Sequence, residues 1–343
     1  MMGLAHIAYT RTVAQCSCMD SLYSIPPLRV ARVRCELRPE GVVSIAVEQR
    51  GNLLRGSFGD CFRRLICDPG CSGYEQCPRK GSCPHELLFA PKRPPGAPKR
   101  LNTPPRAYLF RPPLDSDPCF TTLRPLIFEL RLFGDAISTV GMFLQAFQLL
   151  ARNGIADRRM HLVSAYSLEW DGNPCVELVH AEQLTREQPR VLDFSGLFRD
   201  VGSPDEATIE FLTPIWLREN DKDLHVPTFS ALVCRLRDRV SMLCRLYEGK
   251  EWQAEFAAIG HAASQATVTD WEGHWVEHSR GSTRTGKEMP LGGFLGTITC
   301  HGIDPRLWSM LRIGKEIHVG REVVWGHGQY HIRSADVSAE TTR

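Results

Sequence analysis

The sequence lacks the features that mark membrane-spanning and secreted proteins. It contains no uninterrupted apolar run of the roughly 18 residues that a membrane-spanning helix needs. Its N-terminal segment is broken by His6, Arg11 and Asp20, so it also lacks the apolar stretch of a signal peptide. We therefore expect a cytoplasmic protein that does not enter a membrane, with Met19 as an alternative start.

A strong net charge is absent as well. The 41 Lys and Arg residues exceed the 39 Asp and Glu residues by only 2, so the overall charge does not indicate a nucleic-acid partner. The local charge is uneven, because cations outnumber anions in residues 30–64 and 280–333, whereas anions dominate residues 155–225. This polarity could steer a polyanion to one face, although solvated surface charge explains it equally well.

The remaining composition is that of a folded protein, with 43% apolar and 23% charged residues. A length of 343 residues allows about two domains. Thirteen cysteines in a chain without a signal peptide indicate free thiols or metal ligands rather than a disulfide framework.

The N-terminal half contains alternating and 3.6-residue apolar patterns in a strand, helix, strand, strand, helix, strand order. We expect strands at 28–37, 42–47, 106–111, 123–133 and 162–170, and helices at 53–66 and 137–151. Asn52 and Asp135 are the expected N-caps of the two helices. Gly56 and Gly59 inside the first helix indicate that another part of the chain approaches it closely.

The C-terminal half repeats this order. We expect strands at 208–213, 271–278, 293–300, 315–319 and 328–333, a long amphipathic helix at 229–247, and a short helix from Asp304 that closes at Gly314. The predicted fold class is therefore α+β, with two tandem ferredoxin-like (βαββαβ, RRM-like) domains. The expected divisions are a loose tail at 1–24, a first domain at 25–200 with a Cys-rich insert at 67–105, a second domain at 205–334, and a tail at 335–343.

A glycine-rich loop follows the last short helix. Its sequence is Gly320-Arg-Glu-Val-Val-Trp-Gly326-His-Gly328, and three glycines let backbone N–H groups come close to an anion. The spacing matches neither a dinucleotide fingerprint nor a Walker loop. A hairpin with bulges is the structural alternative.

The cysteine-rich insert is the second unusual segment. Cys67, Cys71, Cys77 and Cys83 lie among glycines and prolines with almost no apolar residues, so the insert cannot fold by burial alone. Four thiolates suit a structural zinc ion, with His85 as the alternative fourth ligand. An iron–sulfur cluster and reduced thiols without metal are the alternatives, because the paired C-x2-C spacing of strong zinc motifs is absent.

The Gly-x5-Gly-x-Gly loop on such a scaffold resembles the CRISPR precursor-crRNA processing endoribonucleases of the RAMP superfamily. The resemblance is carried by residues 208–214 with the Arg-rich helix behind them, and by 278–284, 289–296 and 311–320. It is looser in the N-terminal half, at residues 54–59 and in the cysteine insert.

The resemblance implies binding of CRISPR repeat RNA and cleavage without a catalytic metal. A base would deprotonate the 2′-hydroxyl beside the scissile phosphate, and a 2′,3′-cyclic phosphate would form as the 5′-oxygen leaves with help from an acid. A CRISPR effector complex is the expected further partner. The residues expected to contact RNA are Gly320, Arg321, Gly326, Gly328, Arg280, Arg284, Lys287 and Arg55.

The sequence departs from the family at one point. Many members carry a catalytic histidine in or just before the first helix, and residues 51–67 contain none. His327, in the glycine loop, and His278 are the expected catalytic residues instead. A non-catalytic RNA-binding subunit of a CRISPR effector complex is the alternative function, and a zinc-stabilised RNA-binding protein outside CRISPR biology is a third.

Overall fold

The computed structural model describes residues 22–67, 71, 77, 79–94, 103–198, 203–281 and 288–333, with only the backbone described at 278–281 and 288–291. The expected tail at 335–343 and residues 1–21 lie outside these ranges. Leu22 and Tyr23, which we expected in the loose N-terminal tail, are instead buried, and the Tyr23 hydroxyl donates to the carbonyl of Arg306. None of the described helices is long and apolar enough to cross a membrane.

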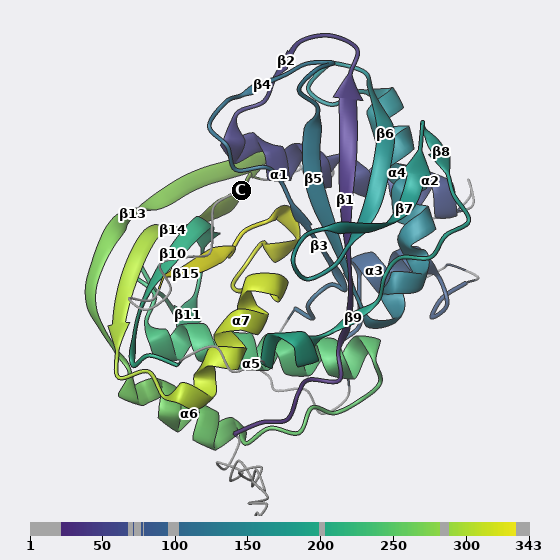
Figure 1. Ribbon diagram of the computed structural model, residues 1–343. Coiled ribbons are helices and arrows are strands. Elements are labelled where there is room, and N and C mark those ends of the chain that lie inside the picture. The colour runs from purple at the N-terminus through teal and green to yellow at the C-terminus, as the bar shows by residue number, and fades with distance from the viewer. Residues whose placement is uncertain are drawn as a thin grey trace, which may run out of the picture.

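The first domain is built on a seven-stranded antiparallel sheet in the order β3-β5-β1-β6-β7-β8, with β9 paired to β1 (Figure 1). Its strands are β1 (Arg29–Pro39), β3 (Tyr108–Arg111), β5 (Leu126–Phe133), β6 (Met160–Leu168), β7 (Pro174–His180), β8 (Gln183–Leu184) and β9 (Leu192–Asp193). A separate short pair joins β2 (Val43–Ser44) to β4 (Cys119–Phe120).

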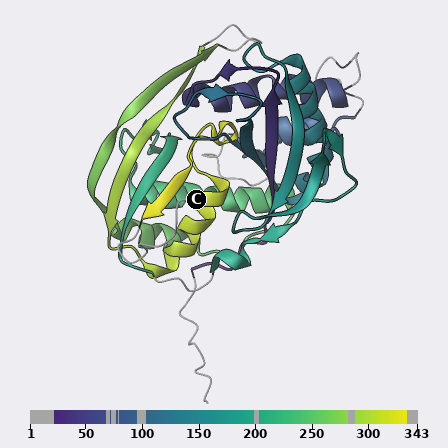
Figure 2. The ribbon, with the colours of Figure 1, turned by 45° about the horizontal axis from the view of Figure 1, so that its top comes forward.

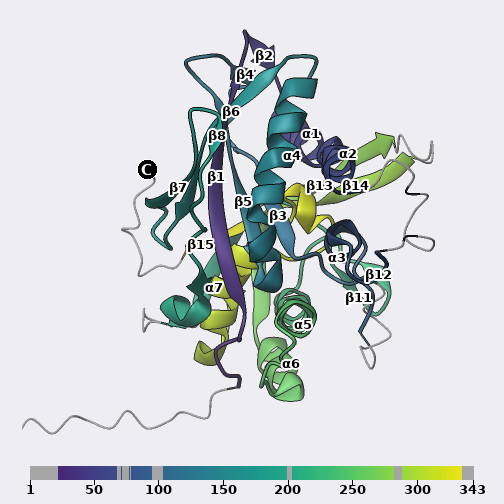
Figure 3. The same cartoon turned by 90° about the vertical axis from the view of Figure 1, so that its right-hand side faces the viewer.

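Helices cover one side of this sheet (Figure 3). They are α1 (Val47–Gly56), α2 (Phe58–Ile66), α3 (Pro84–Phe89) and α4 (Val140–Asn153). The first domain also contains the 3-10 turns η1 (Gly134–Thr139) and η2 (Phe194–Phe198). The core between the helices and the sheet is aromatic, because the ring of Phe58 lies 4.6 Å from that of Phe147, 5.1 Å from Phe110 and 5.2 Å from Phe143. Burial of these rings attaches the first helices to the sheet.

The second domain has a four-stranded antiparallel sheet in the order β13-β14-β10-β15. Its strands are β10 (Glu206–Ile215), β13 (Thr267–Gly281), β14 (Glu288–His301) and β15 (Tyr330–Arg333), beside the small pair β11 (Arg218–Glu219) and β12 (Lys222–Asp223). Its helices are α5 (Phe229–Tyr247), α6 (Phe256–Gln265) and α7 (Trp308–Ile317), with 3-10 turns η3 (Pro305–Leu307) and η4 (Val323–Trp325). Strands β13 and β14 form a long curved hairpin at the edge of the molecule (Figure 2).

The long helix α5 forms where its apolar pattern predicted. Thr228 caps the helix by accepting a hydrogen bond from the N–H of Ala231. Leu232, Leu236 and Leu243 recur on one face and are fully buried. The periodic apolar face therefore decided both the type and the length of this element.

Several predicted boundaries in the first domain are wrong. The expected helix at 53–66 is two helices that meet at Ser57, and its expected cap Asn52 lies inside α1. The expected strand at 42–47 is only two residues long, because α1 already begins at Val47. Asp135 lies in the 3-10 turn before α4 and does not cap it.

In the second domain, the predicted strand at 315–319 is wrong, because its first three residues are the end of α7. Gly314, expected to terminate that helix, lies inside it. A Cβ at this glycine would overlap the Tyr330 hydroxyl, so glycine is needed there for packing and not as a stop signal. Helix α6 and strand β7 had no counterpart in the prediction.

Candidate functional site

The C-terminal end of α7 leads into the glycine-rich loop and is held by arginines from both domains. Arg131 of β5, which is 0% exposed, donates to the carbonyls of Glu316 at 2.6 Å and Lys315 at 3.3 Å. Arg239 of α5 donates to the carbonyl of Ile317 at 3.0 Å. The last carbonyls of a helix have no partner within the helix, so these guanidinium groups both satisfy them and complement the helix dipole.

A half-buried carboxylate lies among the arginines of this junction. Glu129 lies 3.4 Å from Arg131, 3.5 Å from Arg32 and 3.6 Å from Arg111. Burial alone would raise the pKa of Glu129, but Arg131, Arg111 and Arg32 outweigh it and lower the pKa to about 2. The junction therefore contains more cations than anions, and Glu129 is ionised at neutral pH.

His318 begins the connection from α7 to the glycine-rich loop. It is fully buried and adopts a positive φ of 56°, and its Nδ1 lies 3.2 Å from the carbonyl oxygen of His327. Burial first, then Arg111 and Arg131, lower its pKa well below the usual value. His318 is therefore neutral at physiological pH.

The glycines of the loop permit close packing of backbone against backbone. A Cβ at Gly328 would overlap the carbonyl of Val319, and one at Gly326 would lie 2.7 Å from Cδ of Pro112. Both glycines have a positive φ, of 70° and 91° respectively. The loop therefore lies against β3 of the first domain as well as against its own domain.

Several backbone N–H groups of the loop already donate hydrogen bonds within the protein. Gly326 donates to Val323, Gly328 donates to Pro214 and Arg321 donates to Trp216. The predicted anion cradle therefore cannot use these N–H groups as they stand. Side-chain contacts of the loop with RNA stay a prediction.

Arg55, an expected RNA contact, lies between the two domains. Its guanidinium carbon is 5.6 Å from the ring centroid of Trp325 in the loop and 5.1 Å from that of Phe89 in α3. Of the two glycines singled out in the first helix, Gly59 makes room for this arrangement, because a Cβ there would lie 2.9 Å from Nη1 of Arg55. Gly56 has only one atom near its Cβ position, at 3.8 Å.

His85, the alternative zinc ligand predicted from the sequence, lies near several arginines, among them Arg55. The His85 ring stacks on Phe89 at 4.7 Å with an interplanar angle of 7°. Burial, followed by the charges of Arg63, Arg55 and Arg106, lowers its pKa to about 4. No periodic signal placed α3 here, because it belongs to the cysteine-rich insert and not to the repeating strand and helix pattern.

The remaining predicted residues are spread over the loop and the long hairpin. Arg321 is exposed and His327 is half-buried, both on the glycine-rich loop. His278 and Arg280 lie on β13, of which only the backbone is described there. Arg284 and Lys287 lie outside the described residues.

The four cysteines of the insert are only partly brought together. Cys71 hydrogen-bonds to Cys67, and burial together with the nearby Cys83 and Cys71 thiols raises the pKa of Cys67 to about 11. Within the described ranges, no three His, Cys, Asp or Glu side chains meet closely enough to hold a metal ion. The predicted four-cysteine zinc site is therefore not assembled in this structure.

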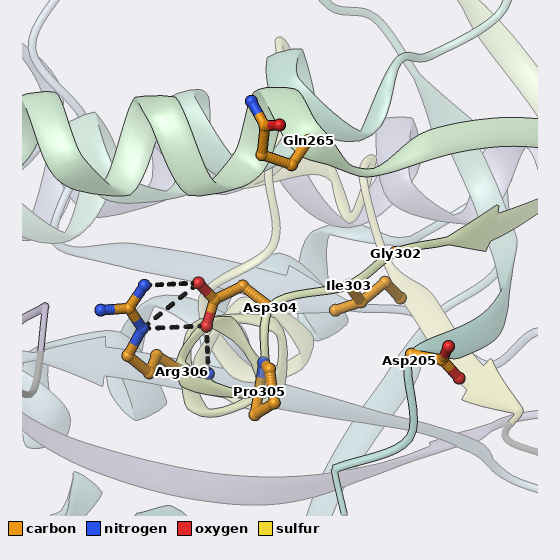
Figure 4. A pocket seen from close by; sticks show the side chains of 7 residues that line it. All are labelled: Asp205, Gln265, Gly302, Ile303, Asp304, Pro305 and Arg306. Carbon is orange, nitrogen blue, oxygen red and sulfur yellow. Dashed lines mark hydrogen bonds and ion pairs between the residues drawn. The ribbon is translucent and has the colours of Figure 1, made fainter. Parts of the chain in front are cut away.

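An open hollow lies at the other end of α7 from the glycine-rich loop (Figure 4). It has a volume of 630 Å³, and its charged pair, Asp304 and Arg306, is joined by an ion pair of 2.6 Å. Its lining residues are Asp205, Gln265, Gly302, Ile303, Asp304, Pro305 and Arg306. No predicted site residue lines this hollow.

Comparison with known proteins identifies the C-terminal domain. Residues 209–330 match the family model of CRISPR-associated endoribonuclease Cas6, and residues 28–190 match a model described only as an N-terminal domain. No curated protein gives a significant match.

Solved structures share the fold across most of the chain. Cas6 from Thermus thermophilus has 14% identity and a TM-score of 0.50 over 89% of this chain and 99% of its own. A Cas6 product complex has 14% identity and a TM-score of 0.50 over 89% and 100%. A partial Cas6-RT-Cas1–Cas2 complex has 13% identity and a TM-score of 0.54 over 92% and 48%. The predicted resemblance to the CRISPR precursor-crRNA processing RAMP family, strongest in the C-terminal domain, is confirmed.

Proposed function

We propose that the protein binds the repeats of CRISPR precursor RNA and cleaves them by attack of the RNA's own 2′-hydroxyl, which leaves a 2′,3′-cyclic phosphate. The observation that carries this proposal is the Cas6 family match over residues 209–330, which includes α7 and the glycine-rich loop. The cations around that loop support it, because the transition state carries extra negative charge on the phosphate.

We also infer that each half is a ferredoxin-like unit. In the first half the order of elements is β1, helices, β3, β5, α4 and β6, and the first and last of these strands are neighbours in the sheet. In the second half the order is β10, α5, β13, β14, α7 and β15, again with the first and last strands adjacent. Both patterns fit the βαββαβ unit that the sequence predicted.

For the chemistry we propose His327 as the first candidate for the base or acid and His278 as the second. The reaction needs one group to accept the 2′-hydroxyl proton and another to protonate the leaving 5′-oxygen, and neither step requires an external water or a metal. Arg321, on the same loop as His327, is the candidate to bind the phosphate.

A non-catalytic RNA-binding subunit is the second candidate function. It is favoured by the first two helices, which carry arginines but no histidine. One of these arginines, Arg50, is committed to the fold, because it is 1% exposed and donates to the backbone carbonyls of Pro113, Asp115 and Asp117. The helices therefore offer no obvious substitute for the missing base.

We further propose that the cysteine-rich insert binds a structural zinc ion, with no catalytic role. The proposal is supported by the adjoining thiols of Cys67 and Cys71, by the nearby Cys83, and by the lack of apolar residues in the insert. Cys77 would complete the set of four ligands.

A labelled CRISPR repeat RNA tests the main proposal. Affinity should fall with rising salt by roughly one log unit per log of salt for each phosphate neutralised. Cleavage should continue during brief exposure to excess EDTA, and a 2′-deoxy substitution at the cut site should leave the RNA bound and intact. Tight binding without any cleavage would instead establish the non-catalytic subunit, and an absence of binding would refute both.

A further inference from the structure

Three aromatic side chains meet where the connection between β10 and α5 touches the long hairpin. The ring centroids of Trp216 and Trp275 are 5.8 Å apart at 79°, and those of His225 and Trp275 are 5.2 Å apart at 60°. We call Trp216, His225 and Trp275 the aromatic cluster. Its members come from two segments of the second domain, so its formation depends on the fold.

The cluster is tied to the glycine-rich loop through Arg321. The guanidinium carbon of Arg321 lies 4.3 Å from the centroid of the Trp216 ring, and its backbone N–H donates to the Trp216 carbonyl at 3.2 Å. The indole N–H of Trp216 donates to the carboxylate of Asp223 at 2.7 Å, and Asp223 also forms an ion pair with Arg218. The Trp216 ring is therefore fixed at its face and at its N–H.

The strand that pairs with β13 carries a glycine beside Trp275. A Cβ at Gly292 of β14 would lie 2.6 Å from the carbonyl oxygen of Val276 and 3.4 Å from Nε1 of Trp275, and the second value is an ordinary van der Waals distance. The glycine therefore serves the close approach of the two strand backbones, and the Trp275 indole packs beside it.

The aromatic cluster is not part of the closed core. Trp252 and Trp308 are buried core residues, each 5% exposed. Trp216 and Trp275 are only half-buried, while His225 and Arg321 are exposed. Among the described residues Arg321 makes no ion pair, so its charge is available to an anion. Half-exposed aromatic rings beside such an arginine suit a flat, anionic ligand.

We propose that the aromatic cluster and Arg321 form a stacking site for unpaired nucleotides of RNA. The inference rests on the proposed function. It further specifies which part of the RNA is bound and which residues bind it. Bases in an RNA duplex are paired and stacked on one another, so their faces are inaccessible. Unpaired bases, in contrast, can stack on aromatic rings and on guanidinium planes. A guanidinium stacked on an indole keeps its N–H groups for a phosphate oxygen. We therefore assign the site to a single-stranded segment of the repeat RNA.

The test compares two tryptophans on the same strand. Trp275→Ala removes a member of the aromatic cluster, whereas Trp271→Ala removes a tryptophan that is 52% exposed but lies four residues away and outside the cluster. Affinity is measured for a repeat RNA with its single-stranded flank and for the trimmed duplex stem alone. Circular dichroism confirms that each variant is folded, and Trp275→Phe serves as the variant that keeps a stacking ring.

We expect Trp275→Ala to weaken binding of the flanked RNA about tenfold, consistent with one lost stacking interaction. Trp271→Ala and Trp275→Phe should bind it almost as wild type, and binding of the trimmed stem should be unchanged in all variants. Equal affinity of Trp275→Ala and wild type for the flanked RNA would overturn the stacking site and leave the proposed function intact. Failure of the wild type to bind either RNA would overturn both the stacking site and the proposed function. Binding of a proline-rich peptide at the aromatic cluster, without RNA binding, would point to a protein partner instead.

Discussion

The backbone carbonyl of Trp325 lies so close to Gly51 of α1 that a Cβ on residue 51 would overlap the carbonyl oxygen. Trp325 belongs to the glycine-rich loop of the second domain, and Gly51 belongs to the first helix of the first domain. The two domains therefore meet at van der Waals distance through main-chain atoms. Any side chain at residue 51 has to push the loop away from α1.

We expect Gly51→Ala to destabilise the protein by about 2 kcal/mol, because overpacking of a close contact costs more than alanine gains as a helix former. Gly56→Ala is the matched control in the same helix, since its Cβ position has only one neighbour, at 3.8 Å. The control should be neutral or up to about 1 kcal/mol more stable. Urea unfolding of the two variants measures both effects, and equal stability would contradict the close packing described.

Glu129 should make the protein sensitive to acid. Its pKa is lowered from 4.5 to about 2 in the folded protein. A lowered pKa contributes stability that is complete above pH 5 or so and is lost as the pH falls toward 2, and this shift corresponds to about 3 kcal/mol. Glu129→Gln should flatten the pH dependence of the free energy of unfolding in that window.

The exposed carboxylate Glu272 offers a control for this experiment. Glu272→Gln should leave the fall in the free energy of unfolding between pH 5 and pH 2 as it is in the wild type. If Glu129→Gln retains the full loss of stability between pH 5 and pH 2, the arginines around Glu129 do not stabilise its charge.

Replacement of the proposed catalytic histidine should slow cleavage strongly without loss of RNA binding. We expect the rate to drop by about 10²–10⁴-fold for whichever of His327 and His278 is the base or acid. His180→Ala is the control, because this histidine is exposed on β7 and pairs with Glu177. Single-turnover cleavage of a repeat RNA provides the rate, and normal rates for both variants would refute the residue assignment but not the mechanism.

Protein purified without added zinc should contain about one zinc per chain. Cys67→Ser and Cys83→Ser should each release the metal, because a structural site uses all four ligands. Cys175→Ser, an exposed cysteine on β7, should retain it. A stoichiometry near zero in folded wild type would discard the zinc site, and an iron-containing sample would replace it with a cluster.

The parts of the fold that follow from periodic burial could be predicted from the sequence. Helix α5 and the strands around residues 206–215 and 288–301 lie close to their expected positions, because an apolar face repeats along each of them. Boundaries set by packing could not be predicted. Gly314 has the sequence context of a helix stop, and only the neighbouring Tyr330 hydroxyl and Leu236 side chain explain why a glycine is needed inside α7.

The site residues stay a prediction, and the contacts within the glycine-rich loop could not be predicted. Three glycines indicate that something approaches the backbone closely, but their spacing does not distinguish an anion from another part of the chain, and here the neighbours of Gly326 and Gly328 are protein atoms. Contacts made between distant segments carry no local signal. Trp216 and Trp275, or Arg55 and Trp325, come together only in the folded chain.

The end of α7 has a mechanical consequence. Arg131 of the first domain donates to the last carbonyls of α7 in the second domain, so a hinge motion between the halves would leave a buried guanidinium and these carbonyls without their partners. The two halves should therefore behave as one rigid frame. For an RNA that contacts both halves, the distance between its contact points would then be fixed by the protein.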